Sequence, residues 1–105
     1  MSTIEYERLA DGRIAAWVFT LADRVLLRRC GELLAHDFGG EAFERFDAMD
    51  QIFWDFLVAG QRVTLRLAEG RGIAVESGDT TARSDELVRQ IAMRLGTLEP
   101  GAAKP

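Results

Sequence analysis

Residues 52–76, with the sequence IFWDFLVAGQRVTLRLAEGRGIAVE, decide the fold of this chain. Two runs rich in aromatic and β-branched residues flank Ala59-Gly60, which predicts a β-hairpin with a two-residue turn and positive φ at Gly60. That turn places three apolar pairs on one face: Phe56 with Val63, Trp54 with Leu65, and Ile52 with Leu67. A one-residue slip of either strand would turn Asp55 or Arg66 toward the core, so the pattern specifies the register.

A third strand is expected at residues 72–76, where Ile73 and Val75 alternate with other residues. Both side chains lie on the apolar face of the hairpin only if the connection leaves three or five residues unpaired. Gly70 and Gly72 make either length possible.

A second hairpin is predicted near the start of the chain, where residues 4–10 and 13–19 flank Asp11-Gly12. Its first arm is short and polar, which is typical of an edge strand. Its second arm, residues 14–19, is apolar on both faces. We expect such a strand to be covered on both sides or to meet a partner.

Two helices are predicted. The first spans residues 21–36, with Thr20 as its N-cap, Asp23 completing a capping-box-like pattern, and Gly39 with Gly40 ending it. Its buried stripe is expected to contain Ala22, Val25, Leu26, Cys30, Leu33 and Leu34. The second spans residues 85–95, with Ser84 as its N-cap and Gly96 after its last turn. Its buried stripe is expected to contain Leu87, Val88, Ile91, Ala92 and Leu95.

Residues 41–51 permit two interpretations. Ala42, Phe43, Phe46 and Met49 fall on helical spacing. The alternative is a strand over residues 42–46 and a turn over residues 47–51. The strand needs a bulge, because one simple register turns Glu44 inward and the other turns Arg45 inward. We favour the strand, since a helix continued to Val58 would remove the better-supported hairpin.

Composition limits the classes of protein to consider. The chain has 105 residues, 48% hydrophobic and 29% charged, which predicts a single domain over residues 1–98 and a flexible tail over residues 99–105. The net charge of −4 disfavours nucleic acid and anionic membranes as partners. No long apolar run or leader-like start is present, so we expect no membrane span and a cytoplasmic protein.

The pattern of the central region resembles a group of short, uncharacterised bacterial proteins of unknown function. The matching residues are Phe38-Gly39-Gly40, Trp54-Asp55, Thr64-Leu65-Arg66-Leu67 and Gly72-Ile73, and the resemblance covers roughly residues 20–95. It implies a strand at residues 41–47 and no particular activity. Such relatives are expected to carry a histidine at the position of Arg66 and a histidine-aromatic pair near Gly70-Arg71. This chain departs from the pattern at both places.

No residue pattern predicts catalysis or a cofactor. Cys30 is alone and is expected to be a buried, inert thiol. His36 is the one histidine, so a multi-histidine metal site is excluded. Turn chemistry accounts for Asp47 and Asp50, and the calcium-loop pattern is not there. Residues 70–72 lack the lysine and the helix start of a phosphate-binding loop.

The sequence therefore predicts a two-layer α+β fold, with an antiparallel sheet of four to six strands and two helices on one face. We expect a non-enzymatic interaction or regulatory protein that binds a protein partner or a second copy of itself, with no cofactor. The candidate interaction surface contains Phe53, Leu57, Arg62, Arg66 and Arg71. Trp17 and Trp54 are expected in the core. Two alternatives remain: a ligand binder or small enzyme with a pocket between the first helix and the sheet, using Asp55, Arg66 and His36, and an acidic secretion-type chaperone.

Overall fold

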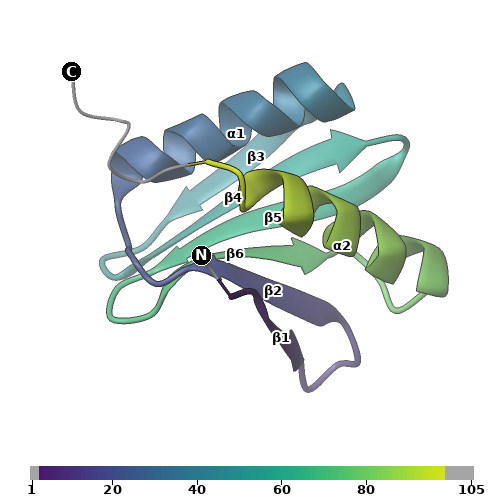
Figure 1. The fold of residues 1–105 in the computed structure, drawn as a ribbon, viewed down its shortest axis with the longest axis horizontal. Helices are drawn as coiled ribbons and strands as arrows, with labels where there is room; N and C mark the ends of the chain where they lie inside the picture. The colour runs from purple at the N-terminus through teal and green to yellow at the C-terminus, as the bar shows by residue number, and fades with distance from the viewer. Residues whose placement is uncertain (1–2, 99–105) are drawn as a thin grey trace.

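Residues 3–98 are described by a computed structural model and form six strands and two helices. The elements are β1 (Glu5–Arg8), β2 (Ile14–Phe19), α1 (Arg24–Phe38), β3 (Glu41–Asp47), β4 (Gln51–Val58), β5 (Gln61–Ala68), β6 (Gly72–Ser77) and α2 (Ala82–Leu95). The strands make one antiparallel sheet in the order β1-β2-β6-β5-β4-β3, and both helices lie on the same face of it (Figure 1). The predicted two-layer α+β fold is confirmed. The predicted tail, residues 99–105, lies outside the described residues.

The central hairpin has the predicted register. Ala59 and Gly60 form the turn between β4 and β5, with φ of 51° and 78°, and two positive φ values suit the twist of the flanking strands. The three predicted apolar pairs are present across β4 and β5. The connection to β6 leaves residues 69–71 unpaired, the shorter of the two predicted lengths, so Ile73 and Val75 join the same face.

The ambiguous segment is a strand, as predicted. β3 pairs with β4, and its register shifts between Ala42 and Glu44, which is the bulge that the sequence required. All seven residues of β3 are exposed, because this strand forms one edge of the sheet.

The core lies between the sheet and the helices. The inner face of the sheet, which we define as the face turned toward α1 and α2, contributes buried apolar side chains from β2, β4, β5 and β6. The edge strand β3 contributes none. Gly31 lets α1 approach the sheet closely, since a Cβ at this position would lie 2.4 Å from the Trp54 ring. Trp54 packs against Phe56, with ring centroids 4.8 Å apart, and is partly buried against the core as expected.

The N-terminal hairpin extends the sheet. β1 pairs with β2, and β2 pairs with β6, so a strand from the start of the chain lies beside one from near its end. The connection between β1 and β2 is longer than the predicted two-residue turn at Asp11-Gly12. Arg8 pairs with Ile14, so residues 9–13 form this connection. β1 is the second edge of the sheet, as predicted, and every residue of β2 is buried.

Both predicted N-caps are wrong. α1 is capped by Asp23, whose carboxylate accepts hydrogen bonds from the backbone N–H groups of Val25 and Leu26. The helix cannot begin at Thr20, because residues 19 and 20 run against Gly72, where a Cβ would lie 1.8 Å from the Phe19 carbonyl oxygen. As a result Val25 is exposed rather than part of the buried stripe.

α2 also begins elsewhere than predicted. Thr81 caps it by accepting a hydrogen bond from the Ser84 N–H, and Ser84 is a buried residue inside the first turn. At the C-terminal end of each helix the predicted glycine is present: Gly39 adopts a left-handed conformation after α1, and Gly96 follows α2.

Candidate functional site

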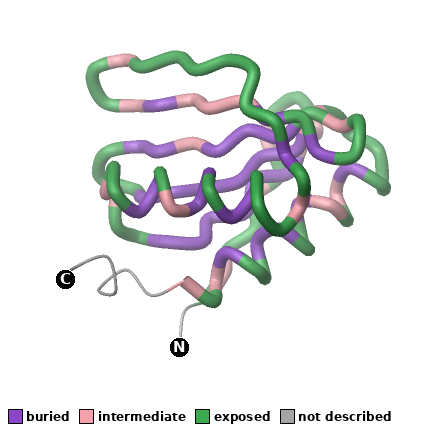
Figure 2. The backbone as a smooth tube through the Cα atoms, turned by 90° about the horizontal axis from the view of Figure 1, so that it is seen from above, coloured by how far each residue is buried: buried purple, intermediate pink, exposed green. Residues whose placement is uncertain are grey.

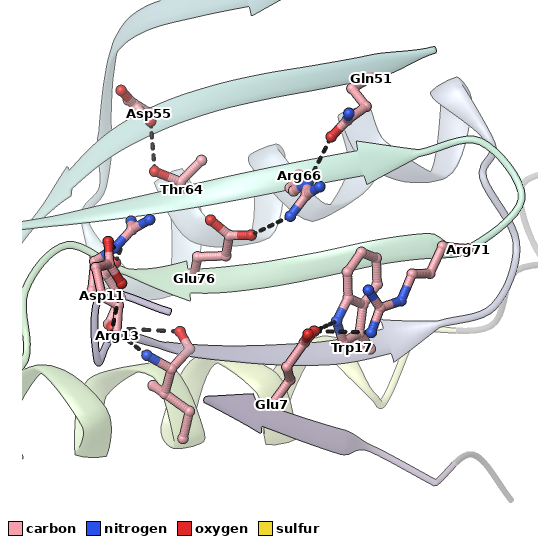
Figure 3. A network of polar contacts seen from close by, with 12 residues as sticks. Glu7, Asp11, Arg13, Trp17, Gln51, Asp55, Thr64, Arg66, Arg71 and Glu76 are labelled. Atoms are coloured by element: carbon pink, nitrogen blue, oxygen red, sulfur yellow. Dashed lines mark hydrogen bonds and ion pairs between the residues drawn. The ribbon is translucent and has the colours of Figure 1, made fainter. Parts of the chain in front are cut away.

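The face of the sheet opposite the helices, here called the outer face, brings most of the predicted surface together. Phe53 lies opposite Arg66, and Leu57 lies opposite Arg62, in neighbouring β4 and β5. These pairs alternate with the apolar pairs of the inner face, so all four side chains share the outer face. Arg71 reaches the same face from the turn between β5 and β6, because its guanidinium lies over Trp17. Figure 3 shows this region with Arg66 at its centre.

Arg66 is held in place by its neighbours. Its Nε donates to Gln51 Oε1 at 2.9 Å, and its Nη1 donates to Glu76 Oε2 at 3.1 Å. The guanidinium also lies over the rings of Phe53 and Trp17, 5.3 and 5.7 Å from their centroids. The side chain of Glu76 is only 4% exposed, although no helix covers it. Arg66 therefore both neutralises a buried carboxylate and presents a rigid planar cation to the surface.

Glu7 binds Trp17 and Arg71 together. The same carboxylate oxygen, Oε1, accepts from Trp17 Nε1 and from Arg71 Nη2, both at 2.9 Å. The pKa of Glu7 is lowered, chiefly by the Trp17 hydrogen bond; burial opposes this shift, and the charge of Arg71 adds to it. The Arg71 guanidinium lies 4.1 Å from the centroid of the Trp17 ring. Trp17 is buried, but in a small cluster on the outer face with Ala68 and Ala74, separate from the main core in which it was expected.

Asp55 completes the network. It accepts a hydrogen bond of 2.6 Å from the Thr64 hydroxyl and lies 3.8 Å from Arg62 Nε. Each of the three predicted arginines thus has a carboxylate within 4 Å on the outer face or its margin. The surface is consequently balanced in charge, and it is not a basic patch of the kind that attracts an anionic polymer.

Apolar side chains are exposed where the network ends. Phe46 of β3 is 62% exposed and lies against Phe53, with ring centroids 6.4 Å apart. Leu57 is 44% exposed on the same face. We define the apolar part of the outer face as Phe46, Phe53 and Leu57 of β3 and β4. Asp55 lies between Phe53 and Leu57, and the rest of the polar network extends over β5, β6 and β2.

A hollow of about 400 Å³ lies beside the Arg66–Glu76 pair, under the turn between β1 and β2. It is lined by Leu9, Ala10, Asp11, Arg13, Gln51, Phe53, Arg66 and Glu76. Arg13 is anchored by bonds to Asp11 at 2.6 Å and to the Ser77 carbonyl at 3.2 Å. The hollow combines two guanidiniums, two carboxylates and an aromatic wall, which suits a small polar molecule rather than a simple anion.

Sequence reasoning missed Glu7, Arg13 and Glu76. The alternation of β6 carried a signal for Glu76, since a residue next to Val75 must point to the outer face. Glu7 and Arg13 gave no such signal, because their place depends on the pairing of β2 with β6.

The residues proposed for a pocket between the first helix and the sheet do not meet. Asp55 and Arg66 lie on the outer face, whereas His36 belongs to α1, has a side chain that is 91% exposed, and contacts Asp37 at 3.2 Å. Cys30 is buried, as expected, and burial raises the pKa of its thiol to about 12, which disfavours the reactive thiolate.

Two further properties concern residues 3–98. Over that range, no three or more His, Cys, Asp or Glu side chains are grouped so that they could hold a metal ion. No helix of the described residues has the length and apolar character needed to cross a membrane.

Comparisons with protein-family models, curated proteins and solved structures found no match to this chain.

Proposed function

We propose that this chain is a non-enzymatic interaction module that binds a protein partner with the apolar part of its outer face. The observation that carries the proposal is the layering. Both helices lie on one face of a six-stranded sheet, and the other face exposes Phe46 and Leu57 beside fixed arginines. Exposed apolar side chains grouped with arginine and aromatic residues are typical of the centre of a protein interface.

The pairing of the arginines predicts how the partner is recognised. Arg62 and Arg66 already have carboxylate neighbours, so they contribute little long-range attraction. The guanidinium of Arg66, which is held by Gln51 and Glu76, and the ring of Phe53 beneath it provide flat contact area that is already ordered, which lowers the entropic cost of binding. We therefore expect an affinity that depends weakly on salt and strongly on apolar contact.

The test is capture of a partner on immobilised protein, with bound proteins identified by mass spectrometry. Leu57→Asp should abolish capture, because it replaces an exposed apolar side chain of the outer face by a carboxylate that must lose water when the partner binds. Met93→Asp is the matched control, since Met93 is 68% exposed on α2, on the other side of the sheet. A partner retained equally by both variants would contradict the proposed surface.

A second candidate function is supported by the hollow beside the Arg66–Glu76 pair. A buried carboxylate next to two anchored guanidiniums is a suitable receptor for a small molecule with both donors and acceptors. Thermal-shift screening with amino acids and small carboxylates tests it. A stabilising ligand whose effect is lost in Arg13→Ala, but kept in Leu57→Asp, would favour this function over the interaction module.

A further inference from the structure

The open edge of the sheet at β3 offers a second surface, which shares Phe46 with the outer face. All seven residues of β3 are exposed, and Figure 2 shows this strand as a continuous green run at the margin of the molecule. An edge strand presents unpaired backbone N–H and C=O groups, which are a template for another strand. We propose that a second copy of this chain pairs with β3 in an antiparallel arrangement, with the two-fold axis at Phe46. This goes beyond the proposed function, because it uses the edge of the sheet and holds whether or not the outer face binds a partner.

Backbone geometry fits this register. The N–H of Ala48 donates to the Gln51 carbonyl at 2.7 Å, so the backbone groups of Ala48 point toward β4. In an antiparallel ladder this direction alternates, so the groups of Phe46 also point toward β4, and those of Arg45 and Asp47 point to the open edge. A two-fold axis at Phe46 then lets Arg45 and Asp47 exchange backbone hydrogen bonds with Asp47 and Arg45 of the second copy.

Charge excludes the other registers. Two copies of one strand pair antiparallel about an axis perpendicular to the sheet, which places one residue opposite itself. Centres at Glu44, Arg45 or Asp47 would bring like charges together, which is destabilising. The bulge between Ala42 and Glu44 interrupts the regular strand before these positions. Phe46 is the remaining centre in β3.

The Phe46 register is also favourable in itself. It places Arg45 of each copy opposite Asp47 of the other, on the inner face, where the two residues already form a pair of 2.9 Å within one chain. Two phenylalanine rings would meet at the axis on the outer face. Phe46 is 62% exposed and Met49, at the adjacent turn, is 96% exposed. Pairing would shield both from water, and the two sheets would form one continuous sheet.

The first experiment is charge exchange, read by sedimentation equilibrium at tens of micromolar protein. We expect the wild-type chain to be a dimer. Arg45→Asp and Asp47→Arg should each raise the dimer dissociation constant by about tenfold or more, since each creates two like-charge pairs. The double variant Arg45→Asp/Asp47→Arg should restore the dimer. Arg83→Asp is the matched control, because it makes the same change of charge at an exposed position on α2.

The second experiment locates the axis by cross-linking. Residues directly opposite in a non-hydrogen-bonded pair have Cα atoms about 4.5 Å apart, which a disulfide can span. Phe46→Cys should therefore form a disulfide-linked dimer on mild oxidation. Glu44→Cys should not, because two copies of residue 44 would be about 14 Å apart in this register. A monomeric wild-type chain, or a dimer that survives Arg45→Asp and forms no Phe46→Cys cross-link, would overturn the proposal.

Discussion

The two faces of the sheet achieve burial in different ways. On the inner face, apolar side chains such as Leu65 are covered by two helices and have no exposed surface. On the outer face, Thr64 and Glu76 are each only 3% exposed, although no helix lies over them. There other side chains of the same face supply the partners: Arg66 donates a hydrogen bond to Glu76 and lies over the Phe53 and Trp17 rings, and Asp55 accepts a hydrogen bond from Thr64. A sheet face without helices over it can therefore bury a carboxylate when an arginine of the same face is itself held by neighbouring side chains.

The largest effect is expected on the inner face. Leu65→Ala removes a side chain with no exposed surface and leaves a cavity between the sheet and the helices. We expect a loss of about 3 kcal/mol in the free energy of unfolding, measured by urea denaturation. A loss below about 1 kcal/mol would mean that the inner face collapses around the cavity and is packed less tightly than described.

The next effect tests the outer face. Arg66→Ala removes the guanidinium that compensates the charge of Glu76, whose side chain is only 4% exposed. We expect a loss of about 2 kcal/mol, since an unpaired buried charge is costly. Adding Glu76→Gln should recover at least half of that loss. Arg62→Ala is the control and should change the free energy of unfolding by less than about 0.5 kcal/mol, because its side chain is 55% exposed.

A smaller effect is expected for the neighbour of Leu65 on the outer face. Thr64→Val keeps the branched shape and removes the hydroxyl that donates to Asp55 at 2.6 Å. We expect a loss of about 1 kcal/mol in urea denaturation, the usual net contribution of one hydrogen bond. Thr64→Ser, which keeps the hydroxyl, should retain this bond. A Thr64→Val protein as stable as wild type would show that the hydrogen bond contributes nothing measurable.

The smallest effect concerns acid. The pKa of Glu7 in the folded chain is below its usual value of 4.5, because the ionised carboxylate accepts the Trp17 N–H and lies beside Arg71. The stabilisation is therefore complete above pH 4.5 and is lost as the pH falls through the lower, folded-state pKa. Glu7→Gln should be less stable than wild type at neutral pH, and the difference should shrink in acid. An unchanged difference between pH 7 and pH 3 would contradict this linkage.

Local patterns predicted most of the fold. The turn at Ala59-Gly60 and the alternation on either side of it determined the register of β4 and β5, since a slip would bury a charge. Even the bulge in β3 was predictable, because both regular registers placed Glu44 or Arg45 against the core. These features depend on residues close together in the chain.

Features that depend on distant residues were missed. Thr20 and Asp23 are both suitable helix caps, and contact of residues 19 and 20 with Gly72 decides in favour of Asp23. Likewise, alternation placed Phe53 and Arg66 on one face, but it did not show that Arg66 donates hydrogen bonds to Gln51 and Glu76. Alternation therefore placed the candidate residues on one face, as the structure has them, whereas the balanced charge of that face was not foreseen.

The position of β2 has a consequence for biosynthesis. This strand is apolar on both faces, and its neighbour β6 is made only after α1 and three further strands have been synthesised. Because chains emerge from the ribosome N-terminus first, β2 has no sheet neighbour except β1 during most of translation. Strands β3, β4 and β5 each pair with the next strand in the sequence, so these pairs can form as soon as that strand is made. The apolar strand β2 therefore stays exposed on the nascent chain until β6 has been synthesised. We expect the N-terminal hairpin to be the segment most prone to aggregate during translation.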